Sequence, residues 1–105
     1  MDTVKDVSAL AAGISETWKS QLLAQVNGQN VRLRVMQDRT AEWHVHADSD
    51  EAFYVLSGTF FLDTDEGTLR IDAGQFGVAR AGIRHRGRVE GRATMIVIDG
   101  FTPSN

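Results

Sequence analysis

Three histidines and one glutamate are the residues of this chain whose types and spacing fit metal chemistry. His44 and His46 are separated by one residue. Glu51 follows five residues after His46, and His85 lies 34 residues beyond Glu51. Neutral imidazole nitrogens and one carboxylate oxygen suit a divalent transition metal. The His-x-His pair alone is also compatible with surface or core histidines, so the elements that position these residues have to be considered.

The N-terminal part of the chain predicts one short helix followed by a hairpin. Apolar residues between positions 4 and 14 have helical spacing, which predicts a helix over residues 4–12 with Asp6 or Ser8 as its cap. Beyond Gly13 the apolar residues alternate with polar ones, as in β-strands. The dipeptide Asn27-Gly28 is a strong signal for a two-residue hairpin turn, so strands are expected on both sides of it.

The rest of the chain predicts further short strands. The first strand of the hairpin is expected over Thr17–Val26 and the second over Val31–Gln37, where Val31, Leu33 and Val35 alternate with Arg32, Arg34 and Met36 as in a half-buried strand. Later strands are expected at Trp43–Val45, Phe53–Ser57, Thr59–Asp63, Thr68–Ile71, Phe76–Ala79 and Ala93–Asp99. Eight to ten short strands in one small chain indicate an all-β sandwich or barrel.

These strands also predict how the four candidate ligands are oriented. Side chains two residues apart on a strand point to the same face, so a strand over Trp43–Val45 would aim His44 and His46 together while Val45 points away. The same periodicity places Glu51 on one face with Phe53 and Val55, at the head of an apolar strip. A carboxylate buried there needs a counter-charge, which a metal ion would supply.

Length and composition limit the classes of protein. A chain of 105 residues is long enough for one domain, here 1–105, and too short for two. It has no cysteine, hence no disulfide framework or thiol nucleophile. The net charge of −3 argues against a nucleic-acid partner. No apolar run approaches the roughly 20 residues that a membrane span needs, and without an export signal the expected location is cytoplasmic.

Five arginines gather near the C-terminal end of the chain. They are Arg80, Arg84, Arg86, Arg88 and Arg92. Such a run is usually a solvated face of strands and loops. The alternative is that it lines the mouth of a pocket and attracts an anionic small molecule. Both interpretations are open at this point.

Two segments of the chain resemble the two motifs of the cupin superfamily. Residues 38–58 read DRTAEWHVHADSDEAFYVLSG and are similar to the first motif, G-x5-H-x-H-x(3,4)-E-x6-G, at His44, His46, Glu51 and Gly58. Residues 74–89 read GQFGVARAGIRHRGRV and are similar to the second motif, G-x5-P-x-G-x2-H-x3-N, at Gly74, Gly82 and His85. Three positions depart from the motifs: Asp38 replaces glycine, Arg80 replaces proline and Val89 replaces asparagine.

This resemblance implies a fold and a ligand set. The implied fold is a small all-β, cupin-type jelly-roll β-barrel with one short N-terminal helix. The implied metal ligands are His44, His46, Glu51 and His85, which would bind manganese, iron, cobalt, nickel, copper or zinc. A barrel that keeps these four residues as a hydrogen-bonded cluster without an ion is the alternative.

Two functions from different classes are compatible with that resemblance. The first is a metal-dependent enzyme acting on a small organic molecule, since the family contains dioxygenases, isomerases and lyases. The second is a ligand-binding or sensing domain in which the metal is structural or orients a ligand. No catalytic residue beyond the ligand set is identified from the sequence. Small cupins that resemble this chain often pair, so a homodimer is expected, with the segment around Trp18 as apolar edge surface.

Overall fold

The computed structural model describes residues 1–100, which form one helix and seven strands. The elements are α1 (Val7–Ala12), β1 (Trp18–Val26), β2 (Gln29–Thr40), β3 (Glu51–Ser57), β4 (Thr59–Thr64), β5 (Gly67–Asp72), β6 (Phe76–Ala79) and β7 (His85–Gly100). No helix in these residues is long and apolar enough to cross a membrane. The expected all-β fold with one short N-terminal helix is confirmed.

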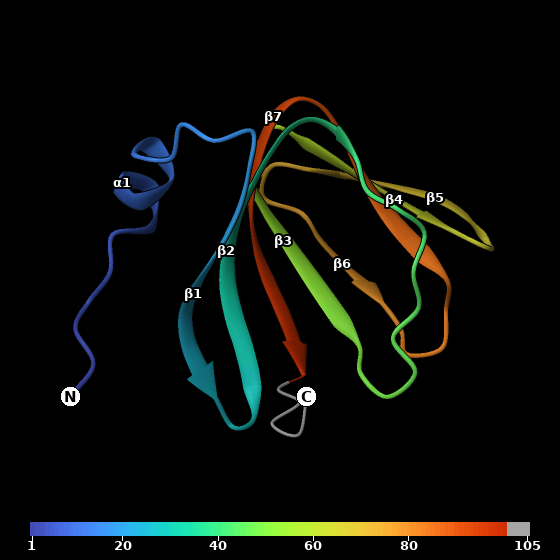
Figure 1. Cartoon of the computed structure of the whole chain (residues 1–105), viewed down its shortest axis with the longest axis horizontal. Helices are drawn as coiled ribbons and strands as arrows, with labels where there is room; N and C mark the ends of the chain where they lie inside the picture. Colours follow the sequence, from blue (N-terminus) through green and yellow to red (C-terminus); the bar gives the residue numbers. More distant parts are fainter. Residues whose placement is uncertain (101–105) are drawn as a thin grey trace.

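All strand pairs are antiparallel, and the long strand β7 connects the two parts of the sheet. The main path runs β1-β2-β7-β3-β6, while the β4–β5 hairpin is attached through β4 to β7. The first residues of β7 pair with β4, and its later residues lie between β2 and β3. In Figure 1 the β4–β5 hairpin folds away from the main sheet, and α1 lies at the opposite end beside β1 and β2. Within residues 1–100 no pairing joins β1 to β6.

The predicted helix and hairpin are confirmed with small changes in their bounds. The helix spans Val7–Ala12 instead of 4–12, and the side chain of Asp6 caps it by accepting a hydrogen bond from the Ala9 backbone N–H at 3.0 Å. Asn27 and Gly28 both have positive φ angles, 50° and 76°, and join β1 to β2. Positive φ at both central residues is what a type I′ hairpin turn requires.

The prediction of a strand at Trp43–Val45 is wrong. Residues 41–50 form no regular strand, and only His44 makes an isolated bridge, to His85. The final strand is also longer than expected: β7 begins at His85 and includes most of the arginine-rich segment. Seven strands therefore replace the expected eight to ten, because one short apolar run is a loop and no further strand forms elsewhere in the described part of the chain.

Strand β2 is buried on both faces, although the sequence predicts a half-buried strand. Leu33 and Val35 are fully buried and pack with Ile14 beneath the apolar side of α1. Met36, on the opposite face, belongs to the main core between the strands. The arginines that alternate with Leu33 and Val35 therefore face the interior of the sandwich instead of solvent.

Gly58, which ends the first motif, is required by both backbone and packing. Its φ is +76°, a conformation that side chains with a Cβ rarely adopt. A Cβ at this position would lie 2.3 Å from the backbone oxygen of Arg92. The tight turn between β3 and β4 therefore brings two backbones closer together than any other residue permits.

A buried carboxylate ties β4 to β5 and β7. Asp63 accepts hydrogen bonds from the hydroxyl of Thr68 at 2.7 Å, from Nε of Arg86 at 2.9 Å and from Nε of Arg88 at 3.1 Å. Its side chain is 8% exposed. The bonds from Arg88, together with those from Thr68 and Arg86, hold the pKa of Asp63 well below its ordinary value.

We expect Asp63→Asn to lower the free energy of unfolding by about 2 kcal/mol at pH 7. A depressed carboxyl pKa contributes stability that is fully present above the pKa of the unfolded chain, near 4, and is lost as the pH falls further. The difference between the wild type and Asp63→Asn should therefore narrow below about pH 4. Denaturant unfolding at pH 7 and pH 3 measures both values.

Asp65→Asn is the control for this substitution, because Asp65 is exposed in the adjoining turn. It should change stability by less than about 0.5 kcal/mol. An equal loss of unfolding free energy in the two variants would contradict the role given to Asp63. So would a loss in Asp63→Asn that is the same at pH 7 and pH 3.

Candidate metal centre

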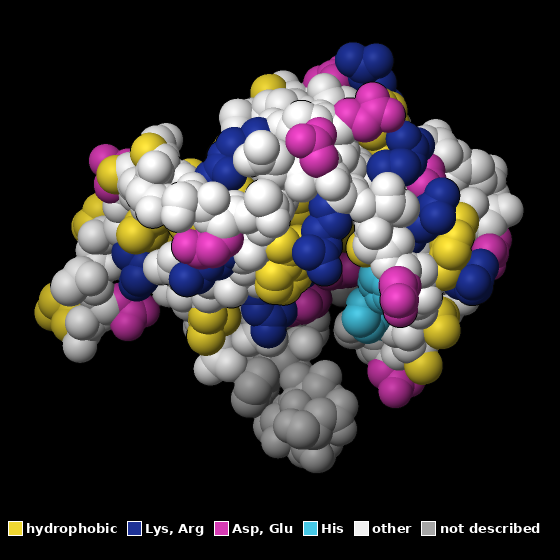
Figure 2. Space-filling model, turned by 45° about the horizontal axis from the view of Figure 1, so that its top comes forward, with side chains coloured by type: hydrophobic (Ala, Val, Ile, Leu, Met, Phe, Trp, Pro, Cys, Tyr) yellow, Lys and Arg dark blue, Asp and Glu magenta, His cyan; other side chains and the backbone are white. Residues whose placement is uncertain are grey.

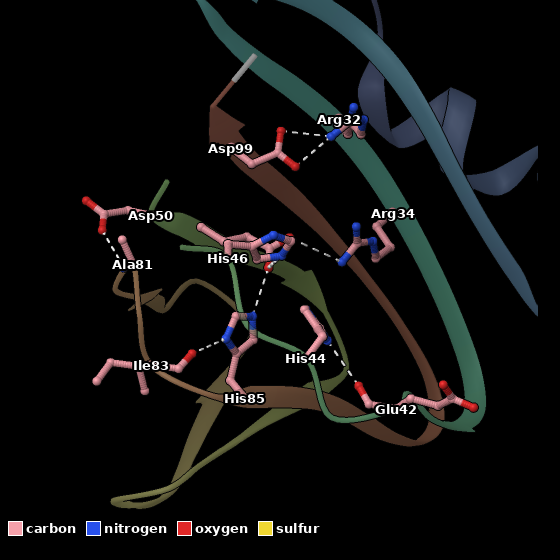
Figure 3. A network of polar contacts seen from close by, with 11 residues as sticks. Arg32, Arg34, Glu42, His44, His46, Asp50, Ala81, Ile83, His85 and Asp99 are labelled. Carbon is pink, nitrogen blue, oxygen red and sulfur yellow. Dashed lines mark hydrogen bonds and ion pairs between the residues drawn. The ribbon is translucent and has the colours of Figure 1, made fainter. Parts of the chain in front are cut away.

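The structure brings together the four residues that the sequence singles out. His44, His46, Glu51 and His85 each offer one donor atom, and these atoms all lie within 4.8 Å of one another. The ring centroids of His44 and His85 are 4.3 Å apart, and those of His44 and His46 are 4.9 Å apart. Figure 3 shows the three imidazoles turned toward a common space. The convergence of the histidines is confirmed, although the strand expected to produce it does not exist.

Backbone hydrogen bonds replace that strand in positioning the histidines. The N–H of His44 donates to the carbonyl of His85 at 2.9 Å, and the N–H of His85 donates to the carbonyl of His44 at 2.8 Å. The carbonyl of His46 accepts a hydrogen bond from the N–H of Gly82 at 2.8 Å. The loop of the first motif is thus attached to the turn of the second, and residues far apart in sequence become neighbours.

Two of the imidazoles are oriented by backbone carbonyls. Nδ1 of His44 lies 3.0 Å from the carbonyl oxygen of Glu42, and Nδ1 of His85 lies 2.9 Å from that of Ile83. A carbonyl oxygen only accepts, so Nδ1 carries the proton in both rings. Their Nε2 atoms then keep a free lone pair, the form in which histidine binds a metal.

The contact between Glu51 and His85 requires a cation. Both side chains are buried, at 6% and 2% exposure, and Nε2 of His85 lies 3.2 Å from Oε1 of Glu51. Nε2 of His46 lies 3.7 Å from the same oxygen. With the His85 proton on Nδ1, a nitrogen lone pair and a carboxylate lone pair face each other. Only a proton or a metal ion between them makes this arrangement favourable, so the donor set fits a metal.

The cluster opens onto a cavity of about 260 Å³. Besides the four residues of the cluster, its lining includes Trp18, Arg34, Phe53, Phe60 and Asp99. Figure 2 shows histidine side chains at the edge of a hollow whose other side carries basic and hydrophobic side chains. Strand β3 contributes Glu51 and Phe53 to the same face, as the sequence predicts.

The five C-terminal arginines do not line this cavity, so their interpretation as an anion-attracting mouth is not supported there. Arg80 pairs with Asp50 on the surface at 3.2 Å. The guanidinium groups of Arg84 and Arg86 each lie 4.8 Å from the ring of Trp43. Arg86 and Arg88 also bond Asp63, and Arg92 donates to backbone carbonyls of Ile14 and Glu16. These arginines are occupied by structural contacts.

The arginine that does face the cavity is Arg34, which the sequence analysis did not single out. Its neighbour on the same face, Arg32, donates from Nη1 to both oxygens of Asp99, at 2.8 and 2.7 Å. The sequence signal that this face is internal is Met36, an apolar side chain on the same face of β2 as both arginines. The signal is hard to recognise in the sequence, because α1 buries the other face of β2, which therefore also carries apolar residues.

The three departures from the motifs have local explanations. Asp38, in place of glycine, has a positive φ of 46° and accepts a hydrogen bond from the N–H of Gly91 at 2.7 Å. Arg80, in place of proline, pairs with Asp50, whose carboxylate also accepts the N–H of Ala81. The hydrogen bond from Ala81, with help from Arg80, lowers the pKa of Asp50. Val89, in place of asparagine, is a buried core residue.

The fold and this cluster together are those of a cupin. Residues 26–101 match the family model for the cupin domain. The chain therefore belongs to the cupin domain family. It is similar to the uncharacterized protein YdbB of Bacillus subtilis, with 30% identity over 100 residues, covering 94% of this chain and 88% of that one.

Solved structures agree in fold. A cupin-2 domain containing protein from Shewanella frigidimarina has a TM-score of 0.85 and 23% sequence identity, covering 92% of this chain and 94% of the other. TT1209 from Thermus thermophilus has a TM-score of 0.81 and 25% identity, covering 95% and 98%. These similarities extend over nearly the whole chain.

Proposed function

We propose that this protein binds a divalent transition metal ion through His44, His46, Glu51 and His85 and uses it to act on a small organic molecule. The observation that carries this proposal is the approach of four donor atoms to within 4.8 Å of one another at one end of a cavity. Three imidazole nitrogens and a carboxylate oxygen suit manganese, iron, cobalt, nickel, copper or zinc. Four protein ligands leave coordination positions open for a substrate when the ion is five- or six-coordinate.

A divalent ion held here supplies a Lewis acid that polarises a substrate oxygen or acidifies a water molecule. The chain's own residues position the site and shield it. The carbonyls of Glu42 and Ile83 fix the rings of His44 and His85. Phe53 and Phe60 close the inner end of the cavity with apolar surface, their rings 4.9 Å apart. Chemistry of the isomerase, lyase or dioxygenase type is compatible with such a site.

A second candidate function is the binding of a small molecule without turnover. The cavity offers one carboxylate besides Glu51, that of Asp99, and both of its oxygens accept hydrogen bonds from Arg32. Among the described residues that line the cavity, no carboxyl or imidazole group outside the four-residue cluster is therefore without an ion-pair partner. This favours either metal-centred chemistry or simple ligand binding over acid–base catalysis by side chains.

Elemental analysis of protein purified without an affinity tag tests the metal site. We expect about one transition-metal ion per chain, and Glu51→Gln should weaken metal affinity by about tenfold or more, because it replaces the anionic donor. Glu42→Gln is the matched control: its side chain is exposed, and only its backbone carbonyl contacts His44. Metal should also be released below about pH 6, where imidazoles become protonated.

Unchanged metal content in Glu51→Gln would contradict the proposed ligand set. An equal loss in Glu42→Gln would show that the effect does not come from the donor atom. Either result would leave the hydrogen-bonded cluster without an ion as the better description.

Water relaxation distinguishes an open metal site from a closed one. When the chain is loaded with Mn²⁺, we expect an enhanced relaxation rate of water protons, since coordination positions not filled by protein exchange water rapidly. A small molecule that reaches the metal through the cavity should reduce this enhancement. A Mn²⁺-loaded protein without enhancement would have a closed site, and the catalytic proposal would fail in favour of a structural metal.

We also propose that the protein forms a homodimer through the outer face of β3 and β6. Tyr54 and Phe76 are cross-strand neighbours and are 41% and 59% exposed, with Leu56 nearby at 37%. Exposed apolar side chains gathered in one place are typical of interfaces. The expectation that the segment around Trp18 provides this surface stays a prediction, since Trp18 lies on the edge strand β1 and is 42% exposed, although it also lines the cavity.

Sedimentation at micromolar concentration tests the proposed dimer. The wild type should sediment as a dimer, and Phe76→Glu should shift it to a monomer, because a charge would be buried in the interface. Leu22→Glu provides the control, since Leu22 is 50% exposed on β1, at the opposite end of the main sheet from β6. A monomeric wild type, or equal effects of both substitutions, would rule out this interface.

A further inference from the structure

Arg34 extends from β2 into the cavity beside the histidine cluster. Its Nη1 lies 3.9 Å from Oε2 of Glu51, which is beyond hydrogen-bond distance. Its Nε is buried and, within residues 1–100, has no hydrogen-bond partner. The side chain is 19% exposed. Figure 3 shows Arg34 directed toward the histidines.

This arrangement is unfavourable for an arginine that has only a structural role. A guanidinium has five N–H donors, and leaving buried donors without partners costs free energy. Burial lowers the pKa of Arg34, and the negative charges of Glu51 and Asp99 oppose this shift only in part. Arg32, two residues away on the same face, is satisfied by Asp99. The Nε donor of Arg34 is therefore left for a group that residues 1–100 do not supply.

The charge balance of the cavity indicates the sign of that group. The carboxylate of Asp99 is neutralised by Arg32. Glu51 and Arg34 carry opposite charges, so they balance when no metal is bound. A divalent ion at the cluster would leave two uncompensated positive charges in a partly closed, partly apolar space. An anion is the ligand that such a space favours.

We propose that Arg34 binds the oxyanion group, carboxylate or phosphate, of a small organic ligand whose other oxygen faces the histidine cluster. The planar guanidinium matches such groups with two parallel hydrogen bonds. The cavity of about 260 Å³ lies just below the range of roughly 300–1,000 Å³ common for larger ligands, which favours a compact molecule. Trp18 lies against this guanidinium, 6.0 Å from ring centre to Cζ, and shields it.

This inference deepens the proposed function and names the ligand class for the same cavity. It also places the anion site at Arg34 instead of at the five arginines between Arg80 and Arg92. Arg34 is a single buried side chain beside the metal ligands, whereas those five form a surface run of charge.

Calorimetric titration of zinc-loaded protein with pyruvate, pyruvamide and inorganic phosphate tests the assignment. Pyruvate or phosphate should bind to the wild type, and the neutral pyruvamide should bind at least about tenfold more weakly than pyruvate. Arg34→Gln should weaken anion binding by about tenfold or more while the zinc content stays unchanged. Arg34→Lys, which keeps the charge without the planar group, should be intermediate.

Arg84→Gln is the matched control, because Arg84 lies on Trp43 outside the cavity. It should leave anion affinity unchanged. The two anions separate the ligand classes: a preference for pyruvate indicates an organic acid, and a preference for phosphate indicates a phosphorylated compound. Zinc-loaded wild type that binds neither anion, or Arg34→Gln with wild-type affinity, would overturn the proposal.

A melting measurement without ligand separates binding from structure. Arg34→Met should melt below the wild type when no metal is bound, because it leaves the buried carboxylate of Glu51 without its balancing charge, and the difference should narrow when zinc supplies positive charge there. A lower melting temperature of the zinc-loaded variant together with unchanged anion affinity would show that Arg34 is structural. Should the wild type hold no metal, the proposed metal function fails separately, and Arg34-dependent binding of pyruvate or phosphate to the metal-free protein would still support this site.

Discussion

The site depends on the reciprocal pair of backbone hydrogen bonds between His44 and His85. These bonds join a loop of irregular conformation to the first residue of a long strand. Because β7 continues from His85 into the main sheet, the loop is anchored to the most extensively paired strand of the protein. The same segment is also attached by hydrogen bonds between His46 and Gly82 and between Asp50 and Ala81. The pair at His44 joins it directly to the strand that carries the third histidine.

A second constraint is electrostatic. Glu51 and His85 are buried against each other with their lone pairs facing, so the folded protein has a built-in need for positive charge at this point. Arg34 lies too far from Glu51 to satisfy the need by a hydrogen bond. A proton and a metal ion therefore compete for the same position. This competition connects the stability of the cluster, its metal occupancy and its response to acid.

Much of the architecture could be predicted from the sequence because local signals were strong. Asn27-Gly28 specified a hairpin, Asp6 specified a helix cap, and alternation placed Glu51, Phe53 and Val55 on one buried face. The four candidate ligands were also found together. Their spacing matches a family motif, and that match holds whether or not the intervening residues form a strand.

Other features could not be predicted because they depend on contacts between distant residues. The run Trp43–Val45 has the composition of a strand, yet within residues 1–100 its only β-pairing is the bridge from His44 to His85. The orientation of Arg34 depends on α1, which buries the Leu33 and Val35 side of β2 and leaves the arginine side for the interior. The sequence does not show which side chains contact the five C-terminal arginines, whereas in the structure acidic and aromatic side chains lie beside them.

The two faces of strand β2 have different roles. Leu33 and Val35 pack against the helix, and Arg34 and Met36 on the opposite face line the cavity. A substitution at Arg34 can therefore change which ligand the cavity binds without changing the packing of Leu33 and Val35. Proteins that share one fold but bind different ligands need positions of this kind, at which a substitution affects binding and leaves the fold intact.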